Sequence, residues 1–365
     1  MEPHNLFYYI IDLRPEQDEF SSRGPHRFSL LTKRAFPSII QKTGKKIPPI
    51  DNNNAFPAEK EGTHMKRGLY YTPIVTALNQ DGSIDWEGNA NVIEHLIHDG
   101  KGVDGILFMG STGDFYSFTA EQKKEMMRFA VKTVNKRVKV LFGTGGMNME
   151  ETIDLTNYSV EAGVDGCLVI NHYYFTQPEA SVEHFYATIA ERCPHATLYF
   201  YSYPDRTGTL LNPKMVARLA AKYKNYVGIK NSVALTQNTR EIIAEVTAVR
   251  PDFQVFVGYD EHFVWNMFSG GAGAMGAISN IAPCMCHDWA DALYNKDYDK
   301  IEEIQKKINL LNRLFVIDTL PNHLVKRALQ LLGVKINDYV PEPFLPITAE
   351  QEAQVIDVMK KCDLL

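Results

Sequence analysis

The chain has 365 residues, of which 45% are hydrophobic and 22% charged, and its formal net charge is -6. This is an ordinary composition for a globular protein, and the acidic balance gives no reason to expect nucleic acid or an anionic membrane as a partner. No apolar run approaches the roughly 20 residues that a membrane helix needs. The five cysteines are scattered and odd in number, which favours reduced thiols in a cytoplasmic protein over a disulfide framework.

Residues 1–64 differ in character from the rest of the chain. They include the stretch "KTGKKIPPIDNNNAFPAEKEGTH", rich in Pro, Asn and Lys, and they show little sustained hydrophobic periodicity. No apolar core follows a basic start, as it would in a signal peptide. We therefore expect a disordered leader or a tag-like extension here, with the fold beginning at Met65.

Eight short apolar runs follow, and they alternate with longer amphipathic stretches. Runs that are apolar on both faces are typical of parallel strands covered by helices. In chain order they are "LYYTPIV" from Leu69, "GILFMG" from Gly105, "VKVLFGTG" from Val138, "GCLVI" from Gly166, "TLYFYS" from Thr197, "VGIK" from Val227, "FQVFVGY" from Phe253 and "GAMGAIS" from Gly273. Eight such units predict an α/β fold, a (β/α)8 TIM barrel over residues 65–290, with an open doubly wound sheet as the alternative.

Helix boundaries are also marked in the sequence. Thr119 with Gln122 three residues later predicts a capping box, and Asn212 before a proline predicts a helix start. The stretch "VEAGVDG" is typical of a helix that ends in a glycine before a strand. After Ile281 no strand run appears, and three helical patterns predict a C-terminal three-helix appendage over residues 291–365.

The chemistry is expected at the carboxyl ends of the strands, where barrel enzymes place their active sites. Lys230 closes the sixth run, Tyr201 lies near the end of the fifth, and Ser111 and Thr112 follow the second. A lysine between apolar walls has a lowered pKa and serves as a Schiff-base nucleophile, and a tyrosine can pass protons to neighbouring hydroxyls. Taken alone, Lys230 is only a charged strand exit; its shared location with Tyr201 favours catalysis.

From about Leu69 to Leu365 the sequence resembles the dihydrodipicolinate synthase/N-acetylneuraminate lyase family of pyruvate-dependent class I aldolases. The motifs "GSTGD", "YYF", "YSYPDRTG", "GIKNS" and "GYDE" occur in the family order. The resemblance implies that Lys230 forms the Schiff base and that Tyr201 is the acid/base. It also implies that Ser111 and Thr112 bind the pyruvoyl carboxylate and relay protons, and that Tyr174 completes this relay across a subunit interface.

The same resemblance implies a substrate pocket, but its motifs point to two branches of the family. Arg206 resembles the arginine with which dihydrodipicolinate synthases bind the carboxylate of the aldehyde. Asp260 and Glu261 of "GYDE" resemble the acids with which sugar-acid lyases bind hydroxyls, although Ala277 stands where neuraminate lyases usually have a serine. The expected substrate-binding residues are Ser111, Thr112, Arg206, Ser232, Gly258, Asp260, Glu261 and Met275, with Met275 contacting the pyruvoyl group through its backbone.

The sequence thus predicts a class I aldolase that cleaves or forms a 2-keto acid from pyruvate and an aldehyde. The expected substrate is a 2-keto-3-deoxy sugar acid or an N-acetylneuraminate type, and the alternative is a 4-hydroxy-tetrahydrodipicolinate synthase that uses aspartate semialdehyde. The resemblance implies no cofactor beyond the lysine Schiff base, no metal, and a homotetramer built as a dimer of dimers. A non-catalytic sensor and a metal- or phosphate-dependent barrel are the competing classes.

Two further motifs carry weaker signals. The segment 271–276 matches GxGxxG, but it enters the eighth strand run instead of following a strand, so we expect close packing there and no dinucleotide. Cys284, Cys286 and His287 lack the spacing of a zinc site and are expected on a helix.

Overall fold

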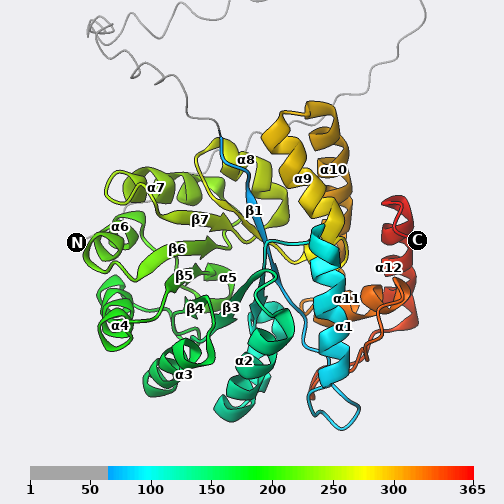
Figure 1. Ribbon diagram of the computed structural model, residues 1–365, viewed down its shortest axis with the longest axis horizontal. Helices are drawn as coiled ribbons and strands as arrows, with labels where there is room; N and C mark the ends of the chain where they lie inside the picture. Colours follow the sequence, from blue (N-terminus) through cyan, green and yellow to red (C-terminus); the bar gives the residue numbers. More distant parts are fainter. Residues whose placement is uncertain (1–64) are drawn as a thin grey trace, which may run out of the picture. The chain divides into compact units, whose positions relative to one another are not determined.

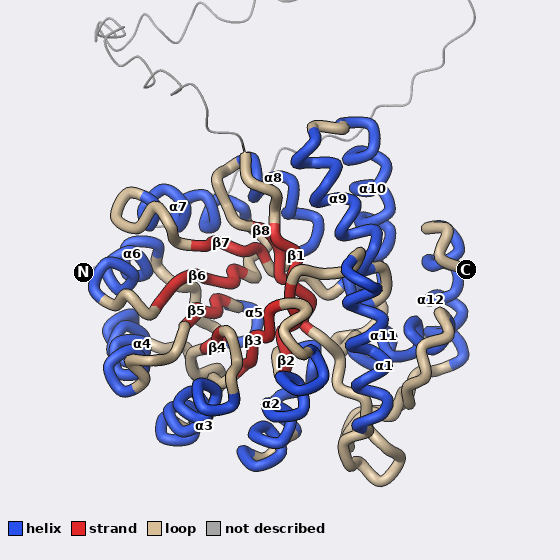
Figure 2. Tube along the Cα trace, in the orientation of Figure 1, coloured by secondary structure: helices blue, strands red, loops and turns tan. Residues whose placement is uncertain are grey.

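The computed structural model describes residues 65–365, and the predicted leader at 1–64 lies outside them. Eight parallel strands close into a barrel in sequence order, and the last strand pairs with the first. The strands are β1 (Leu69–Pro73), β2 (Gly105–Phe108), β3 (Lys139–Gly143), β4 (Gly166–Ile170), β5 (Leu198–Ser202), β6 (Tyr226–Asn231), β7 (Gln254–Val257) and β8 (Gly273–Met275). The closed sheet, visible in Figures 1 and 2, confirms the predicted barrel and excludes the open alternative.

Helices cover the outside of the barrel (Figure 1). They are α1 (Trp86–Ile97), α2 (Ala120–Val134), α3 (Met149–Ala162), α4 (Glu179–Arg192), α6 (Pro213–Lys222), α7 (Thr236–Thr247), α8 (Phe263–Phe268) and α9 (Pro283–Asn295), whereas the short α5 (Pro204–Thr207) lies in the loop region after β5. The predicted boundary signals operate as expected. Thr119 and Gln122 form the capping box of α2, the Asn212 side chain caps α6, and Gly163 ends α3 in a left-handed conformation.

The three expected C-terminal helices are present as α10 (Tyr298–Leu311), α11 (Asn322–Leu331) and α12 (Ala349–Lys361). Figure 1 shows α9 to α12 gathered on one side of the barrel. The expected boundary at residue 290 falls inside α9, which is the helix that follows β8. Within residues 65–365, no helix has the length and apolarity that crossing a membrane requires.

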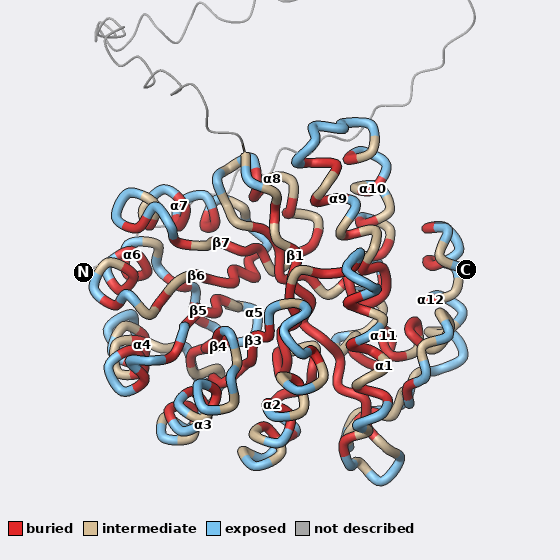
Figure 3. Tube along the Cα trace, in the orientation of Figure 1, coloured by how far each residue is buried: buried red, intermediate tan, exposed pale blue. Residues whose placement is uncertain are grey.

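The strands are buried along nearly their whole length, whereas the outer faces of the helices are exposed (Figure 3). Inside the barrel, large side chains pack against glycines of neighbouring strands. A Cβ on Gly228 would lie 2.7 Å from the Tyr199 ring, and one on Gly105 would lie 2.8 Å from the Tyr71 ring. Glycine at these positions makes room for two tyrosines in a barrel that is filled by side chains.

The GxGxxG segment has the packing role that its position predicts. Gly273 has a φ of 153°, and a Cβ there would lie 1.8 Å from the Leu69 carbonyl oxygen on β1. Only glycine allows β8 to approach β1 closely enough to close the barrel.

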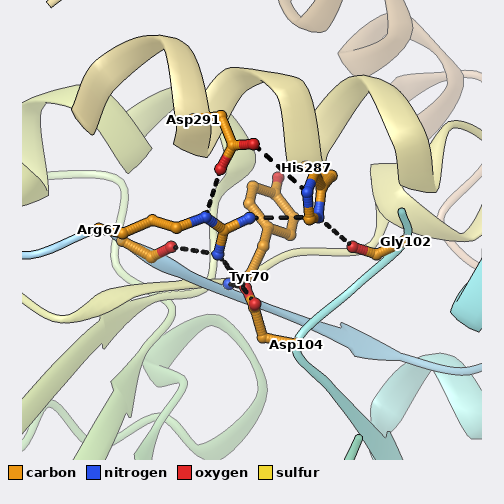
Figure 4. A network of polar contacts seen from close by, with 7 residues as sticks. Arg67, Tyr70, Gly102, Asp104, His287 and Asp291 are labelled. Atoms are coloured by element: carbon orange, nitrogen blue, oxygen red, sulfur yellow. Dashed lines mark hydrogen bonds and ion pairs between the residues drawn. The ribbon is translucent and has the colours of Figure 1, made fainter. Parts of the chain in front are cut away.

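A polar network joins the amino ends of β1 and β2 to α9, as Figure 4 shows. The Arg67 guanidinium lies between Asp291, at 2.5 Å, and Asp104, at 2.8 Å. His287 donates from Nδ1 to the Gly102 carbonyl oxygen at 2.8 Å. This histidine is therefore used in joining α9 to the barrel, at the end where barrel enzymes carry stabilising rather than catalytic residues.

Candidate active site

Lys230 and Tyr201 are neighbours at the carboxyl end of the barrel. They are paired between β6 and β5, and the exposed fraction is 5% for Lys230 and 4% for Tyr201. The Lys230 Nζ atom lies 4.7 Å from the centre of the Tyr201 ring. The two side chains that sequence reasoning assigned to the nucleophile and the proton carrier thus face one another in the barrel interior.

Burial lowers the pKa of Lys230 from 10.5 to about 8, because the ammonium loses its hydration. The negative charge of Asp260 acts in the opposite direction and prevents a larger decrease. A pKa near 8 leaves about a tenth of the amine neutral at pH 7, and the neutral amine is the form that attacks a carbonyl.

The Tyr201 hydroxyl lies 3.5 Å from Ser111 Oγ. Burial raises the pKa of Tyr201, and the hydroxyls of Ser111 and Ser232 partly oppose this increase. The phenol is therefore protonated at neutral pH and can donate a proton. Gly258 leaves room for the Ser232 side chain, because a Cβ at position 258 would lie 1.9 Å from Ser232 Oγ.

Ser111 and Thr112 belong to a single turn of 3₁₀-helix, η3 (Ser111–Gly113), directly after β2. Both flanks of this turn contain a non-glycine residue in the left-handed region, Met109 with φ 49° and Asp114 with φ 56°. Such residues cost about 1–3 kcal/mol each and persist only where the surroundings hold them. The turn that presents the two hydroxyls is therefore a strained one.

The two acids of "GYDE" have different environments. Asp260 is buried, accepts hydrogen bonds from the Tyr70 hydroxyl and the Ala277 N–H, and has its pKa raised to about 6 by burial. Glu261 instead accepts a hydrogen bond of 2.7 Å from the Asn312 side chain, which belongs to the C-terminal region. The carboxylate of Asp260 is thus engaged by protein donors next to the lysine, and that of Glu261 by the region after the barrel.

Arg206 lies on α5, in the loop region after β5. Its Nη2 atom donates to the Thr319 carbonyl oxygen at 3.4 Å, and its guanidinium lies 5.6 Å from the centre of the Tyr203 ring. Within residues 65–365 no carboxylate lies within ion-pair distance of it. This guanidinium has positive charge available for an anionic ligand.

Tyr174 is not brought to the hydroxyl pair by this chain. It is 77% exposed, and its ring packs edge-on against Phe175 at 4.8 Å. Its expected role across a subunit interface stays a prediction. Met275 is fully buried at the end of β8, opposite Tyr71 of β1, and its expected backbone contact with the pyruvoyl group stays a prediction.

Asn322 and Lys326 are absent from the residues that the sequence motifs predict for the site. Both lie on α11, and both contact the turn that carries Ser111. The sequence does contain a sign that Lys326 is buried, because this lysine lies among the apolar residues Val325 and Leu329 of its helix. A lysine inside an apolar stripe calls for an acidic partner.

A buried lysine facing a buried tyrosine at the carboxyl ends of a closed parallel barrel is the arrangement of Schiff-base aldolases. The comparison with protein families agrees with this class. Residues 67–362 match the model of the dihydrodipicolinate synthetase family. The chain belongs to this family, as its motifs indicated, and it is a carbon–carbon lyase of the aldolase type.

Individual relatives come from both branches of the family. The chain is 33% identical over 292 residues to Escherichia coli YagE, whose assigned name is 2-dehydro-3-deoxy-D-gluconate aldolase, covering 80% of this chain and 96% of YagE. The crystal structure of YagE in complex with pyruvate matches with a TM-score of 0.78 and 32% identity, over 82% of this chain and 99% of that one. The 4-hydroxy-tetrahydrodipicolinate synthase of Kosmotoga olearia is 34% identical over 233 residues, 64% of this chain and 78% of its own length.

Proposed function

We propose that this protein cleaves a 2-keto-3-deoxy sugar acid into pyruvate and a hydroxyaldehyde through a Schiff base on Lys230. The observation that carries the proposal is the buried Lys230 amine, with a pKa of about 8, over the ring of Tyr201. The neutral amine adds to the C2 carbonyl of the keto acid, and loss of water gives an iminium. The iminium then accepts the electron pair of the C3–C4 bond as that bond breaks.

Tyr201 carries the protons in this scheme. It passes a proton to the leaving C2 hydroxyl, and as a phenolate it takes the proton of the C4 hydroxyl when the aldehyde departs. The enamine that remains is protonated at C3, and water hydrolyses the iminium to release pyruvate and restore the amine. Ser111, at 3.5 Å from the phenol, extends the route for protons, and the Ser111–Thr112 turn binds the carboxylate of the keto acid.

The choice of a sugar acid rests on the relatives and on Glu261. YagE and a second E. coli protein, YjhH, which is 32% identical over 283 residues, have assigned names of 2-keto-3-deoxy sugar-acid aldolases. Glu261 offers a carboxylate that already accepts an amide hydrogen bond, which is the kind of group that binds hydroxyls.

A second candidate function is 4-hydroxy-tetrahydrodipicolinate synthesis from pyruvate and aspartate semialdehyde. A specific observation favours it: Arg206, at the mouth, has no acidic partner in the described part of the chain, and it could bind the second carboxylate of that aldehyde. The Kosmotoga olearia relative carries this activity in its name.

Borohydride reduction tests the shared chemistry. Pyruvate with borohydride should add one pyruvate-derived mass to the peptide that contains Lys230, and the Lys230→Met variant should show no adduct. An unmodified Lys230 peptide in the parent would contradict the proposal. Pyruvate release from a panel of 2-keto-3-deoxy hexonates and pentonates and from N-acetylneuraminate, beside condensation with aspartate semialdehyde, then separates the two candidates by kcat/KM.

We also propose that the active protein is a cytoplasmic homotetramer in which Tyr174 of one subunit reaches the site of another. The exposure of Tyr174 and Phe175 supports a contact at this position. Sedimentation velocity gives the assembly state. Tyr174→Phe should slow turnover without changing the assembly state. Phe175→Ser should shift the assembly state toward smaller species. A fully active Tyr174→Phe variant would refute the relay.

A further inference from the structure

The turn that carries Ser111 and Thr112 is held from outside the barrel by α11. The Asn322 side-chain amide donates to the Ser111 carbonyl oxygen at 3.1 Å and to Asp114 Oδ1 at 2.5 Å. One amide therefore joins the first residue of the turn to the residue that ends it. Ser111 and Asp114 lie more than 200 positions before Asn322 in the chain, so the C-terminal region holds the turn through a tertiary contact.

A buried ion pair fixes the same end of the turn. Lys326 is fully buried, Asp114 is 3% exposed, and their Nζ and Oδ2 atoms lie 3.6 Å apart. Lys326 also donates to the Tyr339 carbonyl oxygen at 2.9 Å, and the Tyr116 hydroxyl donates to Asp114 at 2.9 Å. No other cation in the described residues pairs with Asp114, so Lys326 alone balances its charge.

These contacts add to the few hydrogen bonds that the turn has otherwise, from the Gly113 N–H to the Gly110 carbonyl oxygen at 3.0 Å and from the Thr76 hydroxyl to the Gly113 carbonyl oxygen at 2.8 Å. Asp114 is left-handed at φ 56°, and a short 3₁₀ turn has weak internal hydrogen bonds: the bond from the Asp114 N–H to the Ser111 carbonyl oxygen is 3.3 Å long. Asn322 donates to that same carbonyl oxygen. We expect that without this contact the turn relaxes and the Ser111 hydroxyl moves away from the Tyr201 phenol.

We propose that Asn322, supported by the Lys326–Asp114 ion pair, is a positioning residue for the aldolase reaction: it holds the Ser111–Thr112 hydroxyl pair against the keto-acid carboxylate and Tyr201. The inference rests on the proposed function and adds a residue of the C-terminal region to its machinery. On this proposal the C-terminal region contributes to catalysis as well as to packing. A misplacement of about 1 Å at a reacting centre can cost on the order of 100-fold in rate.

The test compares Asn322→Ala with a matched variant, Asn225→Ala. Asn225 also donates its amide to two carbonyl oxygens, those of Ala190 and Cys193 at 3.0 and 3.1 Å, but it lies just before β6, at the opposite end of the barrel. Both variants lose two hydrogen bonds of one amide, so both should show a lower melting temperature.

The concentration of active sites in each variant is measured by borohydride trapping, and rates are expressed per active site. On this scale, only Asn322→Ala should differ from the parent. We expect its KM for the keto acid to rise about 10-fold and its kcat to fall about 10- to 100-fold, with Asn225→Ala within about twofold of the parent. Asn322→Ser, which retains one donor, should be intermediate, and it replaces the alanine variant if that one does not fold. If the parent forms the adduct but kcat and KM are unchanged in Asn322→Ala or Asn322→Ser, the inference is overturned and the proposed function is not. A parent that forms no adduct would overturn the proposed function and this inference with it.

Discussion

Burial of the Lys230 ammonium should lower the free energy of unfolding of the protein, and this decrease can be measured. The pKa of Lys230 falls from 10.5 in the unfolded chain to about 8 in the folded protein. Each pKa unit corresponds to about 1.4 kcal/mol, so burying the ammonium costs about 3 kcal/mol at pH 7. The contact with the Tyr201 ring returns about 1 kcal/mol. Replacing the amine by an apolar side chain of similar length should therefore stabilise the fold.

Lys230→Met is the variant that tests this reasoning. At pH 7 and without ligand, we expect its free energy of unfolding to exceed that of the parent by about 2 kcal/mol, which corresponds to a melting temperature about 4–6 °C higher. The same variant should show no adduct with pyruvate and borohydride. Calorimetry or urea unfolding, on protein whose assembly state has been checked, gives the difference.

The pH dependence of this gain has a defined sign. Because the folded pKa is lower than the unfolded one, the folded parent binds fewer protons than the unfolded chain between pH 8 and 10.5. The stability of the parent relative to Lys230→Met therefore rises with pH through this window, and the ionisation cost falls to about 1.5 kcal/mol at pH 9.5. A variant that is less stable than the parent at pH 7, or a difference that stays constant from pH 7 to pH 9.5, would refute the argument.

Three further predictions follow from the site and the network around it. Tyr201→Phe should reduce kcat by about 10²–10⁴-fold, whereas Tyr199→Phe, on the same strand but bonded to Gln254 away from the mouth, should stay within about threefold of the parent in steady-state assays. The rate of adduct formation at saturating pyruvate should rise with pH and level off above the Lys230 pKa of about 8; a flat profile from pH 6 to pH 9 would contradict the assigned pKa. Arg67→Met, which removes the guanidinium between Asp104 and Asp291, should lower the free energy of unfolding by about 2 kcal/mol and leave kcat unchanged, and a loss of kcat would contradict a purely stabilising role.

Local patterns were sufficient to predict most of the fold. Each β-strand is a short run of residues that are apolar on both faces, and this pattern identified all eight. The meeting of Lys230 with Tyr201 also followed from strand order alone, because neighbouring parallel strands end at the same edge of the barrel.

What the sequence could not predict depends on contacts between distant segments. Asp260 and Glu261 are adjacent in the chain, but one carboxylate lies against Tyr70 and the other against Asn312. No local pattern separates two neighbouring acids in this way. The apolar surroundings of Lys326 call for an acidic partner, but no local pattern identifies that partner as Asp114, because the two residues become neighbours only after α11 packs on the barrel.

The dependence of the Ser111 turn on α11 has a consequence during synthesis. A growing chain has all eight strands once Met275 is made, but the amide and the ammonium that secure the turn are supplied by residues about 50 positions later. At 5–20 residues per second, the ribosome needs about 3–10 s to reach them. During that interval a nascent barrel would contain its lysine and tyrosine but lack a fixed carboxylate site, so the order of translation itself would delay keto-acid chemistry until the chain is nearly complete.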